Sequence, residues 1–148
     1  AGLKGKRVAF GAAISMSSTV APMLMLAQAG VKLSDLVGHA QLDRHERVAL
    51  AVLHGDFDAG GLRLDIAREY LPRGLRILSI SQPLPPHLIA ASVNFPNNLA
   101  QRVQTALLHP DETGQRAFMA LGDAISFALV EDAHYQVVRR MMKQIKLQ

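Results

Sequence analysis

The sequence predicts an α/β fold with an open, mostly parallel sheet and flanking helices. Short apolar runs, such as the strand expected at residues 6–10 before Gly11, alternate along the chain with longer helical segments. This alternation is typical of βαβ units. The chain has 148 residues, of which 49% are hydrophobic and 19% are charged. A chain of this size buries roughly 70% of its unfolded surface, so it can form a core of its own.

The first helix is expected at residues 19–29, where Gly30 stops it. Proline is tolerated only in a first helical turn, so Pro22 predicts that the helix begins near Ser18 or Thr19. The segment is apolar nearly all round, which predicts a helix that is covered on most sides.

The middle of the chain repeats the pattern of strand and helix. Short apolar runs predict strands at residues 36–40 and 57–62. Asp43 is the expected N-cap of a helix that runs to Leu53, and a shorter helix is expected at residues 64–70.

The C-terminal half begins with two more predicted strands, at residues 75–79 and 88–92. They flank the proline-rich stretch SQPLPPH, which we interpret as a crossing between two lobes. A first-turn proline, Pro96, opens the next helix, and HPDETG is a loop with a new N-cap. The expected helices are at residues 96–108, 113–121 and 132–145.

Composition argues against several functions. Aromatic residues make up 5% of the chain and tryptophan is absent, so there is no stacking platform for nucleic acid despite the formal charge of +4. Without cysteine there are no disulfides and no thiolate metal sites. His39 and His45 have no HExxH spacing, so we expect no metal. No apolar run reaches the ~20 residues of a membrane span.

A cluster of hydroxyl groups marks the first strand-to-helix junction. The stretch GAAISMSSTVAP, residues 11–22, holds three serines and a threonine within five positions. Ligands of open α/β sheets sit beyond the carboxyl ends of strands, where a helix presents free N–H groups and the positive end of its dipole. The cluster therefore predicts a site for a phosphate-like or carboxylate group. In the alternative interpretation, Ser18 or Thr19 simply caps its own helix.

Three stretches together resemble a known family. They are LKGKRVAFG with SMSSTVAPMLMLAQAGV, HERVALAVLHGDFDAGGL, and GQRAFMALGDAISFALVEDAHYQVVRRMM. In order and spacing they resemble the phosphate-, phosphite- and phosphonate-binding proteins, a branch of the two-lobed, type 2 periplasmic binding proteins. The resemblance implies a lobe-two-like unit with the anion loop at residues 1–72. Residues 73–148 would then hold the crossover, returning lobe-one-like strands and C-terminal helices, without the first half of lobe one.

Carried over onto this sequence, the resemblance implies six ligand-binding residues: Ser15, Met16, Ser17, Ser18, His45 and Asp65. Two departures stand out. Met16 replaces a threonine of the family's loop, which removes one donor. The family's acidic residue in the proline-rich crossing is also missing, where this chain reads PLPPHLIAA. That acid is expected to receive a ligand's amine, so its loss disfavours aminophosphonates, while Arg63 favours a plain anion.

The resulting hypothesis is a non-enzymatic solute-binding domain for an oxyanion such as phosphonate or phosphate. The ligand would be held in an interlobe cleft, and hinge closure would be read by an ABC transporter permease or by a fused sensor kinase or cyclase. The resemblance implies a periplasmic or extracytoplasmic location, and no cofactor is expected. Unpaired strand edges imply a possible homodimer.

Two alternatives stay open at this point. Met16 and the missing acid also fit a degenerate or truncated sensory or interaction module that binds no ligand tightly. Ser17, His45 and Asp65 could form the triad of a small α/β hydrolase, although the chain has no G-x-S-x-G nucleophile elbow.

Overall fold

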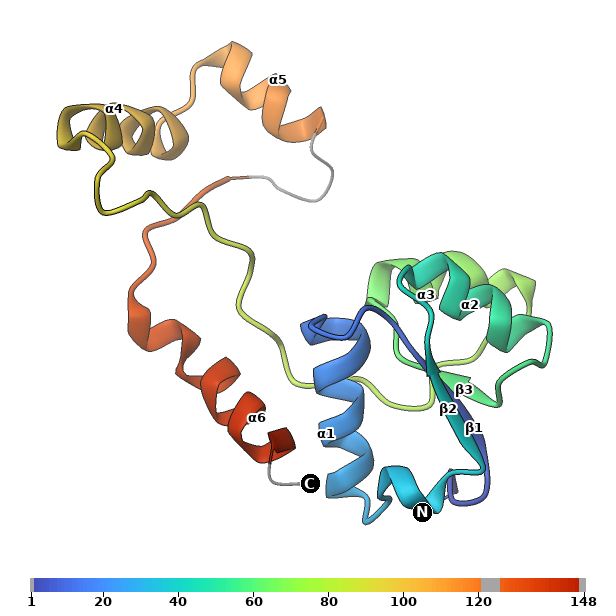
Figure 1. Cartoon of the computed structure of the whole chain (residues 1–148). Coiled ribbons are helices and arrows are strands. Elements are labelled where there is room, and N and C mark those ends of the chain that lie inside the picture. Colours follow the sequence, from blue (N-terminus) through green and yellow to red (C-terminus); the bar gives the residue numbers. More distant parts are fainter. Residues whose placement is uncertain (1, 121–125, 147–148) are drawn as a thin grey trace. The chain divides into compact units, whose positions relative to one another are not determined.

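The computed structural model describes residues 2–120 and 126–146 (Figure 1). The chain divides into two compact units. One contains the chain up to Pro85 together with the segment from Tyr135 onward, and the other runs from Pro86 to His134. The first unit carries the sheet. The assignment of residues 1–72 and 73–148 to two lobes of a binding protein stays a prediction.

The sheet of the described residues has three parallel strands in the order β2-β1-β3. These are β1 at Arg7–Phe10, β2 at Gly38–Gln41 and β3 at Ala59–Gly60. Val8 of the central strand lies opposite His39 on one side and Ala59 on the other. The parallel sheet is therefore confirmed. β3 is shorter than predicted, and just before it the carboxylate of Asp58 accepts the main-chain N–H of Arg7 at 2.7 Å.

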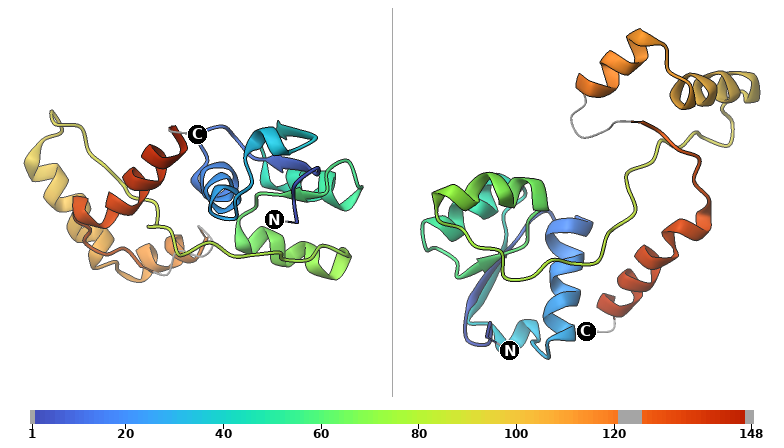
Figure 2. Two further views of the ribbon diagram at one scale, coloured as in Figure 1. Left: turned by 90° about the horizontal axis from the view of Figure 1, so that it is seen from below. Right: turned by 180° about the vertical axis from the view of Figure 1, so that it is seen from behind.

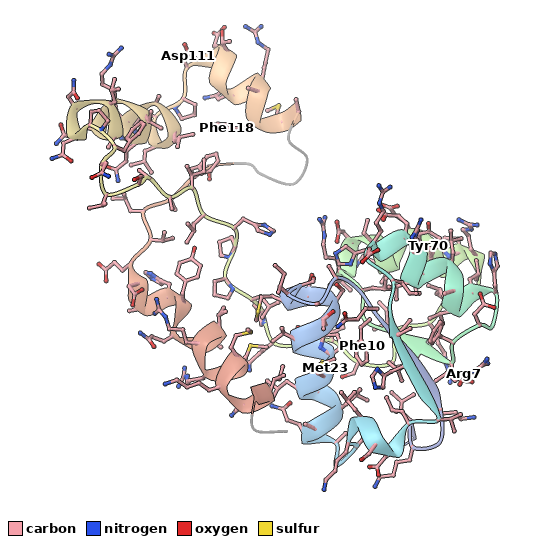
Figure 3. The ribbon with its side chains drawn as sticks, in the orientation of Figure 1. Arg7, Phe10, Met23, Tyr70, Asp111 and Phe118 are labelled. Carbon is pink, nitrogen blue, oxygen red and sulfur yellow. The ribbon has the colours of Figure 1, made fainter. Side chains whose placement is uncertain are left out.

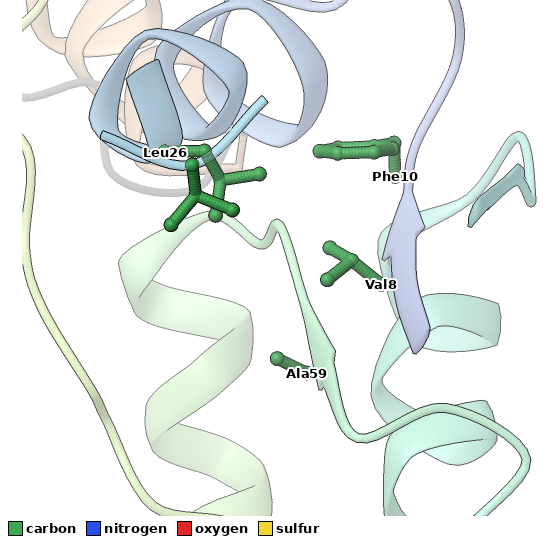
Figure 4. Close-up of a cluster of buried hydrophobic side chains, with 5 residues drawn as sticks. Val8, Phe10, Leu26 and Ala59 are labelled. Carbon is green, nitrogen blue, oxygen red and sulfur yellow. The ribbon is translucent and has the colours of Figure 1, made fainter. Parts of the chain in front are cut away.

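One face of the sheet is covered by α1, Ala21–Gln28. A buried cluster fills the space between them (Figure 4), and its members are Val8, Phe10, Leu26, Val31 and Ala59. Met23 of α1 is partly buried against this cluster (Figure 3). Because alternate strand residues share a face, Val8 and Phe10 both reach this core.

The opposite face is covered by α2, His45–Leu53. Ala9, which alternates with Val8 and Phe10, is fully buried, and so is Val48 of α2. A Cβ added at Gly60 would lie 2.5 Å from Cγ1 of Val48, so the helix approaches β3 closely. α3, Leu64–Tyr70, packs beside α2 and matches its predicted range.

The first helix begins earlier than predicted. A turn of π-helix, η1, occupies Met16–Val20 and runs into α1, with Ser15 rather than Ser18 or Thr19 at the N-cap. Pro22 has no N–H for the carbonyl of Ser18 four residues before it. That carbonyl instead accepts the N–H of Gly11 at 3.1 Å, which ties the helix to the end of β1.

The expected cap of the next helix is also wrong. Arg44 occupies the N-cap position of α2 and makes no side-chain cap hydrogen bond. Asp43 instead has φ +57°, in the left-handed region, which fits the tight turn that joins β2 to α2. Short 3-10 turns precede β2 at Leu33–Asp35 and follow α3 at Leu71–Arg73.

The strands predicted at residues 75–79 and 88–92 are wrong. Both segments are extended without a β-ladder, because no other strand of the described chain pairs with them. The sheet-bearing unit is completed by α6, Gln136–Lys146, which runs alongside α1 (Figure 2). Met141 of α6 is buried against Val20, Ala21 and Leu24.

The second unit contains α4, Asn97–Leu108, and α5, Glu112–Ala120. Asp111 caps α5, because its Oδ1 accepts the N–H of Gly114 at 2.8 Å, so the predicted new cap in HPDETG is confirmed. Phe118 packs edge-on against Phe127, with ring centroids 4.9 Å apart. The predicted helix end at residue 121 lies outside the described residues. The last predicted helix starts as a 3-10 turn, Asp132–Tyr135, before α6.

Candidate functional site

The residues predicted to form the site follow the carboxyl ends of the three strands. Ser15 comes after β1, His45 opens the helix after β2, and Asp65 lies in the first turn of α3 after β3. Because the strands are parallel, these ends share one edge of the sheet (Figure 1). This is the edge where ligands of open α/β folds bind.

The serine loop is held by its own hydrogen bonds. Oγ of Ser15 accepts the N–H of Ser18 at 3.3 Å and the hydroxyl of Ser18 at 2.7 Å. The hydroxyl of Thr19 donates to the carbonyl of Ala12 at 2.8 Å. Ser18 and Thr19 are 1% and 2% exposed. These two buried hydroxyls therefore stabilise the conformation of the loop.

The remaining hydrogen-bond donors of this loop are not used by the described part of the chain. Oγ of Ser15 already accepts two hydrogen bonds, so its own proton is left to donate outward. In the described part of the chain, the N–H groups of Met16 and Ser17 and the half-buried hydroxyl of Ser17 have no hydrogen-bond partner. First-turn N–H groups together with serine hydroxyls suit an anion.

Met16 contributes to the loop through its backbone N–H and not through its side chain. Its side chain is partly buried against the cluster of Val20, Ala21, Leu24 and Met141. A threonine hydroxyl at this position would face that apolar cluster. The methionine thus supports the docking of α6, and its N–H is the part that an anion could use.

A glycine after β3 lets the third loop approach the serine loop. The N–H of Gly61 donates to the carbonyl of Ala9 at 2.9 Å. A Cβ added at Gly61 would overlap the carbonyl of Ser18 and lie 2.6 Å from Cγ of Pro22. This contact was not predicted from the sequence, although the paired glycines of DAGGL are a signal for close backbone approach.

His45 is oriented by the third loop. Its Nδ1 accepts the main-chain N–H of Arg63 at 3.2 Å. Burial lowers the pKa of His45 from its usual value and the Arg63 guanidinium lowers it further, whereas Glu46 and Asp65 oppose this. The imidazole is therefore neutral at pH 7, with its proton on Nε2. Nε2–H is then a donor.

Asp65 is paired with Arg63. Nε of the guanidinium donates to Oδ1 at 3.0 Å, and Nη2 forms the second bond of the fork to Oδ2. These bonds are the main reason why the pKa of Asp65 is lowered. The structure thus joins His45 and Asp65 through one arginine, whose charge the sequence had suggested for a ligand.

Neither a metal site nor a membrane span is found among the described residues. No cluster of three or more histidine, aspartate or glutamate side chains there has the arrangement of a metal site. None of the helices described is long and apolar enough to cross a membrane.

The chain is similar to proteins of one known family. Residues 1–135 match the family described as ABC transporter, phosphonate, periplasmic substrate-binding protein. A solved structure, PhnD1 from Prochlorococcus marinus (MIT 9301) in complex with methylphosphonate, is similar in fold, with a TM-score of 0.80 and 20% sequence identity. The match covers 98% of this chain and 58% of that one, so the chain spans less than two thirds of this structural relative.

Proposed function

Since the chain belongs to the family of phosphonate periplasmic substrate-binding proteins of ABC transporters, we propose that it binds a phosphonate-type oxyanion at the serine loop. One observation carries this proposal. The free N–H groups of Met16 and Ser17 open a helix at the carboxyl edge of a parallel sheet. Two serine hydroxyls, those of Ser15 and Ser17, stand beside them.

The proposed recognition uses hydrogen bonds to a charged acceptor. The oxyanion takes the N–H groups of Met16 and Ser17 and the hydroxyls of Ser15 and Ser17, with the helix dipole adding favourable potential. The hydroxyl of Ser18 donates to Oγ of Ser15 and so orients it. His45 donates from Nε2, which its bond with the Arg63 backbone leaves as the protonated nitrogen. No bond of the ligand is broken, so the domain is proposed to bind and release it unchanged.

The wider role is also a proposal. A domain of this family in the periplasm would close over its solute and deliver it to an ABC transporter permease. A fused sensor kinase or cyclase is the alternative reader of the same closure. A second copy of the chain is a further proposed partner.

A thermal-shift series tests the proposed ligand class. Methylphosphonate, phosphite, phosphate and sulfate are added separately to the full chain. A ligand at 100 times its dissociation constant stabilises the folded state by roughly 2.7 kcal/mol, so a phosphonate-type anion should raise the melting temperature clearly. If all four leave the melting temperature unchanged at millimolar concentration, the proposal fails.

One observation favours a second candidate, a sensory or interaction module without a tight ligand. The loop has a methionine at its second position, and that side chain supports α6 rather than a ligand. The module would keep the fold and the α6 contact without ligand-induced stabilisation. The same thermal-shift series separates the two candidates.

A further inference from the structure

We propose that α6 is a positioning element for the serine loop, so that anion binding and the docking of α6 favour each other. The inference rests on the proposed function and names a regulation of that same site. Met16 is the residue that joins the two, because its backbone lies in the loop and its side chain lies against the cluster that α6 completes.

The contact between α6 and the loop is apolar. Met141 of α6 is 4% exposed, and the side chain of Met16 packs on the buried cluster that contains it, formed by Val20, Ala21, Leu24 and Met141. The other side chains of α6 packed against this cluster are Val137, Met142 and Ile145. They recur at helical spacing, so one face of α6 meets both η1 and α1.

The docking of α6 has room to change. Beside Met141 lies an open hollow of about 410 Å³, whose other walls are α1 with Ala29 and the extended segment 79–82. Closely packed interiors leave few voids larger than a water molecule, so α6 has fewer packing partners here than a core helix has. Elements with few buried apolar contacts open at low free energy. Two states follow: a docked α6 that holds the side chain of Met16, and an undocked α6 that releases it.

The docked state presents the better anion site. Met16 is the first residue of η1, directly after the N-cap Ser15, and its N–H is one of the donors proposed for the anion. When the side chain is anchored on α6, the loop loses less conformational freedom on binding. A ligand that binds one state better shifts the equilibrium toward that state, and the coupling is reciprocal. The anion should therefore strengthen the docking of α6.

Substitutions away from the loop test the coupling. Methylphosphonate is titrated calorimetrically into the full chain and into Met141→Ala, which should bind it about fivefold more weakly, the lower end of a typical coupling between sites. Met141→Leu keeps an apolar side chain of similar size and should restore the affinity. Val31→Ala is the matched control, since Val31 is 2% exposed in the separate cluster between α1 and the sheet. It should lower stability and leave the affinity unchanged.

Two further measurements separate an effect through Met16 from general destabilisation. Met16→Ala keeps the N–H and removes the side-chain contact, so combining it with Met141→Ala should weaken binding no further than either substitution alone. Saturating methylphosphonate should also slow amide hydrogen exchange in α6 of the unmodified chain and leave exchange in α4, which belongs to the other unit, unchanged. The exchange measurement needs no variant, so it decides the matter even if Met141→Ala does not fold.

The outcomes separate this inference from the proposed function. If methylphosphonate binds but Met141→Ala keeps the full affinity, or exchange in α6 is not slowed, the coupling is overturned and the proposed function stands. An equal loss of affinity in Val31→Ala also overturns the coupling, because the effect would then follow general stability. If methylphosphonate does not bind the unmodified chain, this inference fails together with the proposed phosphonate site.

Discussion

The hydroxyl of Ser18 donates a hydrogen bond to Oγ of Ser15 over 2.7 Å, from a position that is 1% exposed. Together with the N–H of Ser18, it occupies the acceptor capacity of that oxygen. Ser15 is thereby left as a donor toward the carboxyl edge of the sheet. The buried Ser18 thus determines that the hydroxyl of the partly exposed Ser15 acts as a donor and not as an acceptor.

Replacement of Ser15 should lower both stability and affinity. Ser15→Ala removes the N-cap of η1 and leaves the buried hydroxyl of Ser18 without its acceptor. Loss of an N-cap costs about 0.5–2 kcal/mol of unfolding free energy. Urea unfolding measures this loss, and calorimetry with methylphosphonate measures the weaker binding. Unchanged values in both experiments would contradict the structure of the loop.

Gly61 should not tolerate a methyl group. Gly61→Ala places a Cβ against the carbonyl of Ser18 and 2.6 Å from Cγ of Pro22, so backbone must move. Overpacking of this kind costs typically 1–3 kcal/mol, which urea unfolding would detect. Gly38→Ala is the control, since its Cβ would lie 4.0 Å from Cγ of Arg7. Equal effects of the two substitutions would show that the third loop does not abut the serine loop.

His45 should make stability depend on pH. Its folded-state pKa is lowered from 6.5, chiefly by burial, so the unfolded chain takes up the proton first as the pH falls. Unfolding free energy should therefore decrease as the pH falls from 7 through the unfolded pKa. In His45→Gln that part of the pH dependence should be missing, and in His54→Gln it should persist. Melting temperatures at several pH values between 7 and 5 provide the comparison.

The extended segments should promote association. Leu78 and Ile89 are 56% and 63% exposed, and neither lies in a β-ladder. Exposed apolar chain with unpaired backbone attracts another strand, and a second copy supplies the same segments. Sedimentation velocity at micromolar concentration should show a species larger than a monomer. Leu78→Lys with Ile89→Lys should reduce it, whereas a clean monomer of the unmodified chain would refute the prediction.

Local sequence signals predicted the strand and helix pattern of the sheet-bearing unit. Gly11 and Gly30 marked element ends, and the range of α3 was correct, because these features depend on neighbouring residues. Parallel topology then placed the three site loops at one edge. The membership of Ser15, His45 and Asp65 in one binding site stays a prediction.

Features that depend on distant partners were not predictable in this way. The apolar runs at residues 75–79 and 88–92 favour extended chain, but a strand also needs a neighbour, and none in the described residues supplies it. The early start of the first helix depends on the bond from Gly11 to Ser18 across the loop. The pairing of Arg63 with Asp65 depends on the extended backbone at the start of α3, which their spacing alone does not indicate.

Titration of methylphosphonate into three proteins by calorimetry tests the central claim most directly. The proteins are the unmodified chain, Ser17→Ala, and Ser34→Ala, an exposed serine at the opposite edge of the sheet. A hydrogen bond to a charged group contributes about 1.5–3 kcal/mol. We expect Ser17→Ala to weaken binding by about that amount without a change in melting temperature, and Ser34→Ala to bind like the unmodified chain. Equal affinity in all three proteins would contradict an anion site at the serine loop.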